Sequence, residues 1–113
     1  MDNFIDYSDF EKVIMVAGTI LTCCENTKAR KPSYILEIDF GLEWGIKKSS
    51  AQITDLYDSE TLIGKQVTAV INFPPMRIAG VKSEVLVLGV PGEDGSVVLL
   101  HPERSVENGK RIF

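Results

Sequence analysis

The sequence contains few of the side chains that metal sites and nucleophilic catalysis require. Among its 113 residues there is a single histidine, His101, and the two cysteines, Cys23 and Cys24, are adjacent. Neighbouring side chains on a β-strand point to opposite faces, so we expect no disulfide within the chain. Zinc sites usually take paired cysteines that are about two to four residues apart, together with further ligands. The sequence therefore predicts no metal site, and we expect His101 to be structural or merely exposed.

Phosphate-binding and catalytic motifs are also missing. Neither GxGxxG nor GxxxxGK[ST] occurs, which excludes the two common glycine-rich phosphate loops. Ser49 and Ser50 have no base beside them in the sequence, and the carboxylates are scattered through segments typical of turns. We therefore predict a non-catalytic protein without a cofactor.

Long hydrophobic runs and a basic leader are absent as well. No run approaches the ~18 apolar residues of a membrane-spanning helix. The first eleven residues hold four acidic side chains and no basic one, whereas a secretory signal peptide opens with a basic region. We expect a cytoplasmic protein without a membrane partner.

Basic residues are outnumbered by acidic ones, 12 against 16, which gives a formal net charge of −4. Phosphate binding depends on the local potential rather than on the total charge. The sequence is therefore compatible with a basic face on an acidic body, and with a nucleic-acid partner. Eight of the twelve basic residues fall in two windows, with Lys28, Arg30, Lys31, Lys47 and Lys48 in the first and Lys65, Arg77 and Lys82 in the second.

The apolar pattern is typical of short strands separated by turns. Alternating or β-branched runs predict strands over residues 13–25, 34–41, 43–53, 66–73, 84–90 and 97–101. Gly18 is expected to mark a bend or bulge in the first of them. Ser8 and Glu11 fit a capping box that opens a short helix. Residues 54–66 carry weaker helical signals, residues 74–82 are expected to form a loop, and 91–96 and 108–109 to form turns.

This order predicts an all-β protein, an OB-fold five-stranded barrel over residues 1–113. Short helices are expected at the N-terminus and between the third and fourth strands. An SH3-like barrel is the alternative, but it explains the helical segment less well. Tyr34, Trp44 and Phe73 lie near the basic windows, where exposed aromatic rings could stack on bases. Tyr34 and Phe73 sit in strand patterns and are favoured as core residues, whereas Trp44 is left open.

The segment LIGKQVTAVINFPPMRIAGVKSEVLVLG, residues 62–89, resembles the tRNA-binding domain of methionyl- and phenylalanyl-tRNA synthetases. Shared features are L-[VI]-G-[KR]-x-V, a strand ending in Asn, and then Pro, Arg or Lys, Gly and Ser-Glu. GTI at 18–20, ILEIDFG at 35–41 and GIKKSSAQIT at 45–54 extend the resemblance to stand-alone, CsaA-type members of the family. Two positions depart from the family pattern, since Ile14 and Val16 replace its usual Asp and Arg.

The resemblance implies a homodimeric tRNA-binding protein with chaperone-like activity. It implies tRNA contacts at Asn72, Arg77, Lys82 and Ser83, with Lys47 nearby. The family lysine before the second strand is replaced by Pro32, so that Arg30 or Lys31 would take its role. Cations meet phosphate oxygens and Asn or Ser offers neutral donors, while Pro74 and Pro75 stiffen the loop that carries Arg77.

Two functions remain open after these considerations. The first is binding of folded tRNA through its shape and backbone. The second is a chaperone that holds apolar segments of unfolded or exported polypeptides, suggested by the apolar run VIMVAGTI and the terminal Ile112 and Phe113. A dimer interface formed by the N-terminal helix and the C-terminal tail explains the same apolar residues more simply.

Overall fold

The computed structural model of the chain describes residues 3–113 and consists mostly of strands. It has three short helices in this part of the chain, α1 (Tyr7–Glu11), α2 (Gly41–Trp44) and α3 (Ser59–Leu62). The strands are β1 (Met15–Glu25), β2 (Tyr34–Asp39), β3 (Ile46–Ala51), β4 (Gln66–Val70), β5 (Met76–Ile78), β6 (Val81–Ser83), β7 (Leu86–Val87), β8 (Gly89–Pro91) and β9 (Val97–Leu99).

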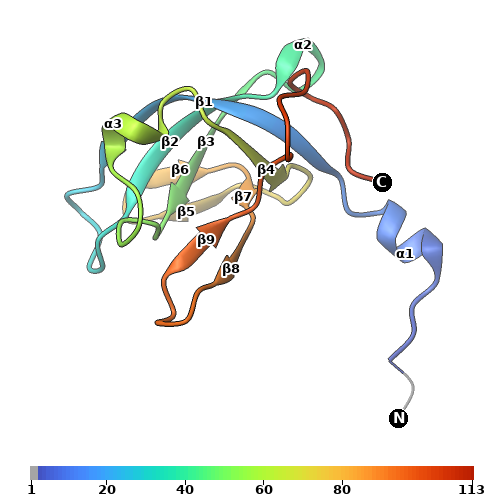
Figure 1. The fold of residues 1–113 in the computed structure, drawn as a ribbon, viewed down its shortest axis with the longest axis horizontal. Coiled ribbons are helices and arrows are strands. Elements are labelled where there is room, and N and C mark those ends of the chain that lie inside the picture. The colour runs from blue at the N-terminus through green and yellow to red at the C-terminus, as the bar shows by residue number, and fades with distance from the viewer. Residues whose placement is uncertain (1–2) are drawn as a thin grey trace.

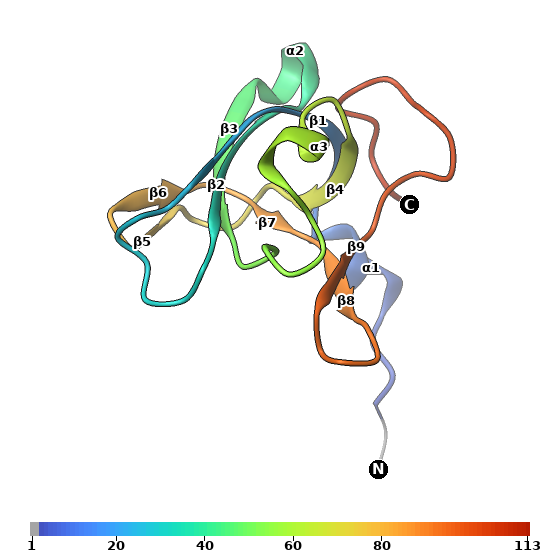
Figure 2. The same cartoon turned by 60° about the vertical axis from the view of Figure 1, so that its left-hand side comes forward.

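Five antiparallel strands form the central sheet in the order β3-β2-β1-β4-β7, and the sheet curls into a nearly closed barrel (Figures 1 and 2). The segment leading into β7 returns to β3, where Glu84 N donates to Lys48 O at 2.8 Å and Ser49 Oγ donates to Val85 O at 3.2 Å. Two further hairpins, β5–β6 and β8–β9, extend from the barrel. The predicted all-β OB-fold with a helix between the third and fourth strands is confirmed.

The core lies inside this barrel and follows the alternation of the strands. Along β2, buried side chains alternate with half-buried ones, so that Leu36 and Ile38 are fully enclosed. Phe40 is also fully buried and lies against Gly18 on β1. A Cβ atom at Gly18 would be 2.5 Å from Phe40 Cδ1, so glycine is needed there for close packing.

The sequence predicts a bend or a bulge at Gly18, and the prediction of a bulge at this position is wrong. The register of β1 against β2 shifts between Ile20 and Thr22 instead. Before this point β1 pairs with β4 through Met15–Thr19, and from Thr19 onward it pairs with β2. One strand thus serves two neighbours, and the irregularity lies just beyond the change of partner.

Several element boundaries differ from the predicted ones. The N-cap of α1 is Asp6 rather than Ser8, and Asp9 Oδ2 accepts a hydrogen bond from Asp6 N at 3.2 Å. The predicted strand 43–53 begins only at Ile46, because its first residues belong to α2. Gly41 begins this helix and Gly45 follows it, and both glycines have positive φ. The predicted strand 84–90 is divided into β7 and β8. The predicted loop 74–82 contains the β5–β6 hairpin.

The C-terminal residues run back along β1. Gly109 N donates to Ala17 O and Ile112 N donates to Met15 O, both at 2.8 Å, after the predicted turn at residues 108–109. Arg111 Nη2 donates to Glu11 O at 2.6 Å, which fastens this tail to the end of α1. Figure 1 accordingly shows the C-terminus beside α1, while α1 itself projects away from the barrel.

Within the described part of the chain, no helix is long and apolar enough to cross a membrane.

Candidate nucleic-acid interface

The β5–β6 hairpin brings the two most strongly predicted cations together. Arg77 and Lys82 are direct cross-strand partners in its antiparallel register, and both are exposed. Directly opposed residues project from the same face of a ladder, and like charges in this position repel. The hairpin turns at Ala79 and Gly80, which have φ values of 46° and 82°. The arrangement weakens the hairpin slightly and concentrates positive charge on one face.

The loop of residues 26–33 packs against the tip of this hairpin. Asn26 is buried, and its Nδ2 donates to Ala79 O at 3.4 Å while its Oδ1 accepts from Lys28 N at 3.0 Å. Lys28 extends over Gly80, so that a Cβ atom there would be 3.2 Å from Lys28 Cδ. We refer to Lys28, Arg77 and Lys82 as the hairpin cations. Lys28 was not among the predicted site residues, and only its place in the first basic window could have suggested it.

Arg30 and Lys31 belong to the same loop and are exposed. Arg30 lines a shallow cleft of about 360 Å³ together with Asn26 and Ser33. The structure therefore places both predicted residues on the segment that carries Lys28. They follow in sequence the residues of this loop, Asn26 and Lys28, that contact the tip of the hairpin.

Lys47 has a different environment from the hairpin cations. It lies on β3, and its Nζ is 3.9 Å from Glu84 Oε2 in a partly buried ion pair. Glu84 Oε1 also accepts a hydrogen bond from Lys48 N at 3.1 Å. The positive charge of Lys47 is thus partly balanced within the chain.

The two predicted neutral donors are occupied by contacts within the fold. Asn72 Oδ1 accepts from Ile14 N at 3.0 Å, and Asn72 Nδ2 donates to Lys12 O at 2.7 Å. Ser83 is buried, and its Oγ accepts from Ser50 N at 3.1 Å. Both residues hold the segment that contains the hairpin in place, one at each end. Their contact with RNA stays a prediction.

An apolar groove of about 450 Å³ lies beside the hairpin. It is lined mainly by Phe73, Pro74, Pro75, Met76, Ile78, Val85 and Leu86. Phe73 is 52% exposed, so the prediction that it belongs to the core is wrong. Tyr34 is buried as predicted, and its hydroxyl donates to Tyr57 O at 2.8 Å. Trp44 is half-buried and packs against the core.

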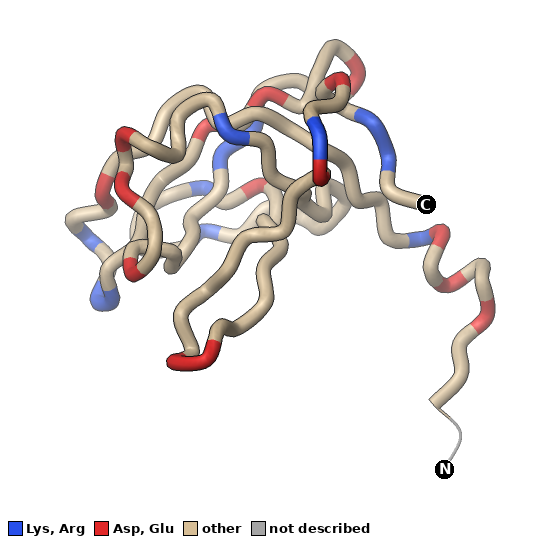
Figure 3. Tube along the Cα trace, in the orientation of Figure 1, with Lys and Arg blue, Asp and Glu red and all other residues tan. Residues whose placement is uncertain are grey.

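The charges are distributed unevenly over the described residues (Figure 3). Lys12, Arg104 and Lys110 are paired with nearby carboxylates, those of Asp9, Glu103 and Glu107. Between residues 3 and 113, the ion pairs include none of the hairpin cations and neither Arg30 nor Lys31. The charged side chains at the tip of the β8–β9 hairpin, Glu93 and Asp94, are in contrast both acidic.

No group of three or more potential ligands among residues 3–113 could hold a metal ion. Cys23 and Cys24 are both free thiols, as expected from their adjacency. Desolvation, together with the neighbouring Cys24, raises the pKa of Cys23 to about 11, so this thiol stays protonated at neutral pH. His101 is exposed.

Comparison with known proteins identifies close relatives of this fold. The crystal structure of the chaperone CsaA from Bacillus anthracis has 51% sequence identity and a TM-score of 0.91, with 97% of this chain and 99% of that chain covered. The CsaA chaperone protein from Picrophilus torridus has 46% identity and the same TM-score, with 97% and 100% covered. A MetRS-related protein from Pyrococcus horikoshii has 27% identity and a TM-score of 0.86, with both chains covered completely.

Curated sequences give a consistent result. The methionine–tRNA ligase of Bacteroides fragilis is 34% identical over 108 residues, which cover 96% of this chain. The chain spans only 16% of the length of that ligase. The tRNA_bind family, described as a tRNA binding domain, matches residues 15–111. The chain therefore belongs to the tRNA-binding domain family.

Proposed function

We propose that this chain is a non-catalytic, single-domain tRNA-binding protein that recognises the shape and backbone of tRNA through the face of the hairpin cations. The observation that carries the proposal is the convergence of Lys28, Arg77 and Lys82 from two segments, without a carboxylate partner among the described residues. Family membership and the CsaA and methionine–tRNA ligase relatives support it.

Physical chemistry explains how this surface would bind RNA. Arginine and lysine form charge-assisted hydrogen bonds with phosphate oxygens, and RNA phosphates would relieve the repulsion between Arg77 and Lys82. The hairpin is held by the Asn26 contact at its tip and by Ser83 at its base, so little ordering entropy is lost on binding. Arg30, Lys31 and Lys47 would add contacts at the margins of the surface. The chemistry requires no cofactor or metal, and a cytoplasmic location fits a tRNA partner.

Binding of total tRNA should depend steeply on salt. Three phosphate contacts give a slope of roughly −2.7 in a plot of log K against log salt, or about a 40-fold loss between about 50 and 200 mM salt. A gel-shift or fluorescence titration at two salt concentrations measures this loss, with double-stranded RNA and single-stranded DNA as comparisons. Affinity for tRNA that is independent of salt, or no binding at low salt, would contradict the proposal.

We further propose a homodimer whose interface contains α1 and the C-terminal tail. Tyr7 and Phe10 form an aromatic pair on α1, with ring centroids 5.9 Å apart, yet no residue of α1 is buried within the chain. Ile5 and Phe113 are 72% and 99% exposed, and such apolar side chains are typical of an interface between subunits. Light scattering at micromolar concentration should give twice the 12.5 kDa mass of one chain. A mass of one chain would contradict this proposal.

The apolar groove favours a second candidate function, that of a CsaA-type chaperone which holds apolar peptide segments, including those of exported proteins. Phe73, Met76 and Leu86 are each more than half exposed around it, and an apolar peptide would cover them. Aggregation of an unfolded client should then be suppressed, and Met76→Ser should weaken the suppression severalfold while tRNA affinity stays unchanged. Suppression that is abolished by competing tRNA would argue against a separate peptide site.

A further inference from the structure

A second cleft is lined by the start of β4, by part of β9 and by the segment that follows β9. It has a volume of about 520 Å³, within the range of small-molecule sites. Residues 64–67 at the start of β4 border it on one side and residues 101–105 on the other, with Tyr57 between them. The β5–β6 hairpin instead packs beside β3, where Ser83 bonds to Ser50. The cleft shares no lining residue with the apolar groove beside the hairpin and contains none of the hairpin cations, so it is distinct from the candidate RNA surface.

The walls of this cleft are fixed by hydrogen bonds. Gln66 Nε2 donates to Val106 O at 2.7 Å, and Gln66 Oε1 accepts from Val106 N at 3.0 Å. This amide therefore ties β4 to the segment that follows the opposite wall. The hydroxyl of Tyr57 accepts from Leu99 N at 3.0 Å, which holds the ring at the boundary with β9. Because hydrogen bonds already fix the walls of the cleft, little conformational entropy is lost when a ligand binds.

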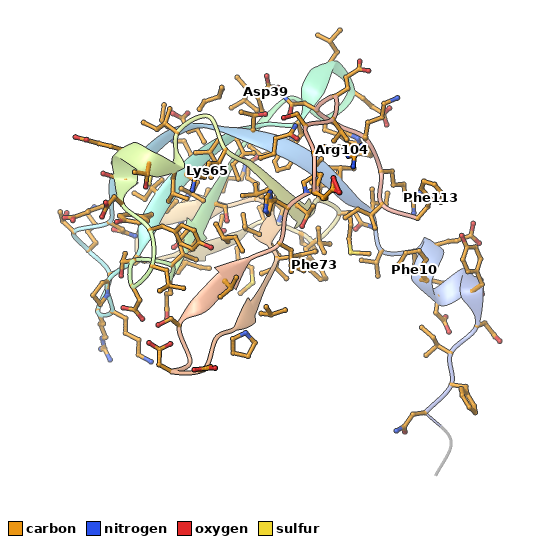
Figure 4. The ribbon with its side chains drawn as sticks, viewed as in Figure 1. Phe10, Asp39, Lys65, Phe73, Arg104 and Phe113 are labelled. Atoms are coloured by element: carbon orange, nitrogen blue, oxygen red, sulfur yellow. The ribbon has the colours of Figure 1, made fainter. Side chains whose placement is uncertain are left out.

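Two cations are among the lining residues of the cleft, Lys65 just before β4 and Arg104 in the segment after β9, and both are labelled in Figure 4. Lys65 Nζ lies over the Tyr57 ring, 5.8 Å from its centroid, and the ion pairs within residues 3–113 do not include it. Arg104 uses Nε and Nη2 to bind Glu103, at 2.7 and 3.0 Å, which leaves its Nη1 for another acceptor. The bond from Arg104 also lowers the pKa of Glu103, so this carboxylate stays ionised and paired.

The cleft also contains other polar side chains that can donate hydrogen bonds. His101 and Ser105 face the space between the walls and offer an imidazole and a hydroxyl. With Glu103 balanced by Arg104, the ammonium of Lys65 supplies the net positive charge. An ammonium group, a free guanidinium N–H and two further donors match the oxygen atoms of a phosphate group.

We propose that the cleft between residues 64–67 and 101–105 binds a phosphate group, with Lys65 as its main charge partner and Arg104, His101 and Ser105 as further donors. The phosphate can belong to a small phosphorylated compound or to the RNA backbone, and the chemistry of recognition is the same in both cases. This site shares no residue with the hairpin cations.

The test is a titration of the full chain, observed by NMR at the His101 ring and the Lys65 side chain. Inorganic phosphate and a nucleoside 5′-monophosphate are the two small probes. We expect saturable shifts at millimolar concentration, and about a tenfold weaker affinity in Lys65→Gln, which removes the charge but keeps a polar side chain that is one atom shorter. Lys110→Gln is the matched control, because Lys110 is exposed, pairs with Glu107 and does not line the cleft. Arg104→Gln should weaken binding by a smaller factor.

The tRNA arm distinguishes the two sources of phosphate. If the small probes bind and Lys65→Gln leaves tRNA affinity unchanged, the ligand is a small phosphorylated compound. If the small probes do not bind and Lys65→Gln weakens tRNA binding as much as Arg77→Gln does, the phosphate belongs to RNA. The proposal is overturned if neither arm responds, or if Lys65→Gln and Lys110→Gln respond equally. Failure of all tRNA binding would leave the small-probe arm intact, so the two proposals fail separately.

Discussion

Reversal of both hairpin charges, Arg77→Glu with Lys82→Glu, should lower the affinity for tRNA by about 100-fold or more at low salt. A charge-assisted hydrogen bond contributes about 1.5–3 kcal/mol, and the lower end of this range is roughly tenfold in affinity for each contact. The two new carboxylates would also repel the phosphates that the cations attracted. The slope of log K against log salt should become shallower by about two, because two phosphate contacts are lost. Titrations of wild type and variant at several salt concentrations measure both effects.

The matched control is Lys12→Glu with Lys110→Glu, which makes the same change in net charge. Both lysines are exposed and already paired, with Asp9 at 3.3 Å and with Glu107 at 4.0 Å. This variant should lose only the small, long-range part of the attraction. Thermal melts should show that the hairpin variant stays folded, since both replaced side chains are exposed. An equal loss of affinity in the two variants would mean that total charge, rather than the hairpin, determines binding.

Phe40→Ala should produce the largest loss of stability, about 4 kcal/mol, because Phe40 is fully buried against β1. This is a large fraction of the roughly 5–15 kcal/mol by which a domain of this kind is stable. The melting temperature should fall by roughly 15 °C. Urea denaturation followed by the fluorescence of Trp44 gives the free energy of unfolding directly.

A second substitution tests whether the contact with Gly18 causes this effect. Gly18→Ala alone should cost about 1–3 kcal/mol, since its methyl group would lie 2.5 Å from Phe40 Cδ1. In the Phe40→Ala background the same methyl group enters the space left by the ring. The cost of Gly18→Ala should then fall by at least about 1 kcal/mol. Additive effects would show that the two positions do not share a packing site.

The sequence predicted the barrel well because the barrel depends on local and repetitive signals. Strand alternation in β2 and the turn signals at residues 91–96 and 108–109 are properties of neighbouring residues, and the structure confirms them. Gly18 was misread because an isolated glycine in a strand is compatible with either a bulge or close packing. The distinction depends on Phe40, which is distant in sequence, and no local pattern contains that information.

The site was predicted less completely for a similar reason. The position of Arg77 opposite Lys82 requires a hairpin. The two prolines that precede this hairpin and the shortness of its strands are typical of a loop instead. The role of Asn26 and the place of Lys28 depend on contact with Ala79 and Gly80, about fifty residues away. The sequence also could not show that Asn72 and Ser83 already have partners within the fold. Residue type indicates what a side chain can bind, whereas availability is decided by the tertiary structure.

The side-chain amide of Asn72 joins two regions that have separate proposed roles. It bonds to Lys12 O and Ile14 N, immediately after α1, and it directly precedes Phe73 at the rim of the apolar groove. A movement of α1 would therefore pull on the backbone that positions this rim. In the proposed dimer, subunit association and binding in the apolar groove would be thermodynamically coupled through this contact, and each should alter the equilibrium of the other by the same factor.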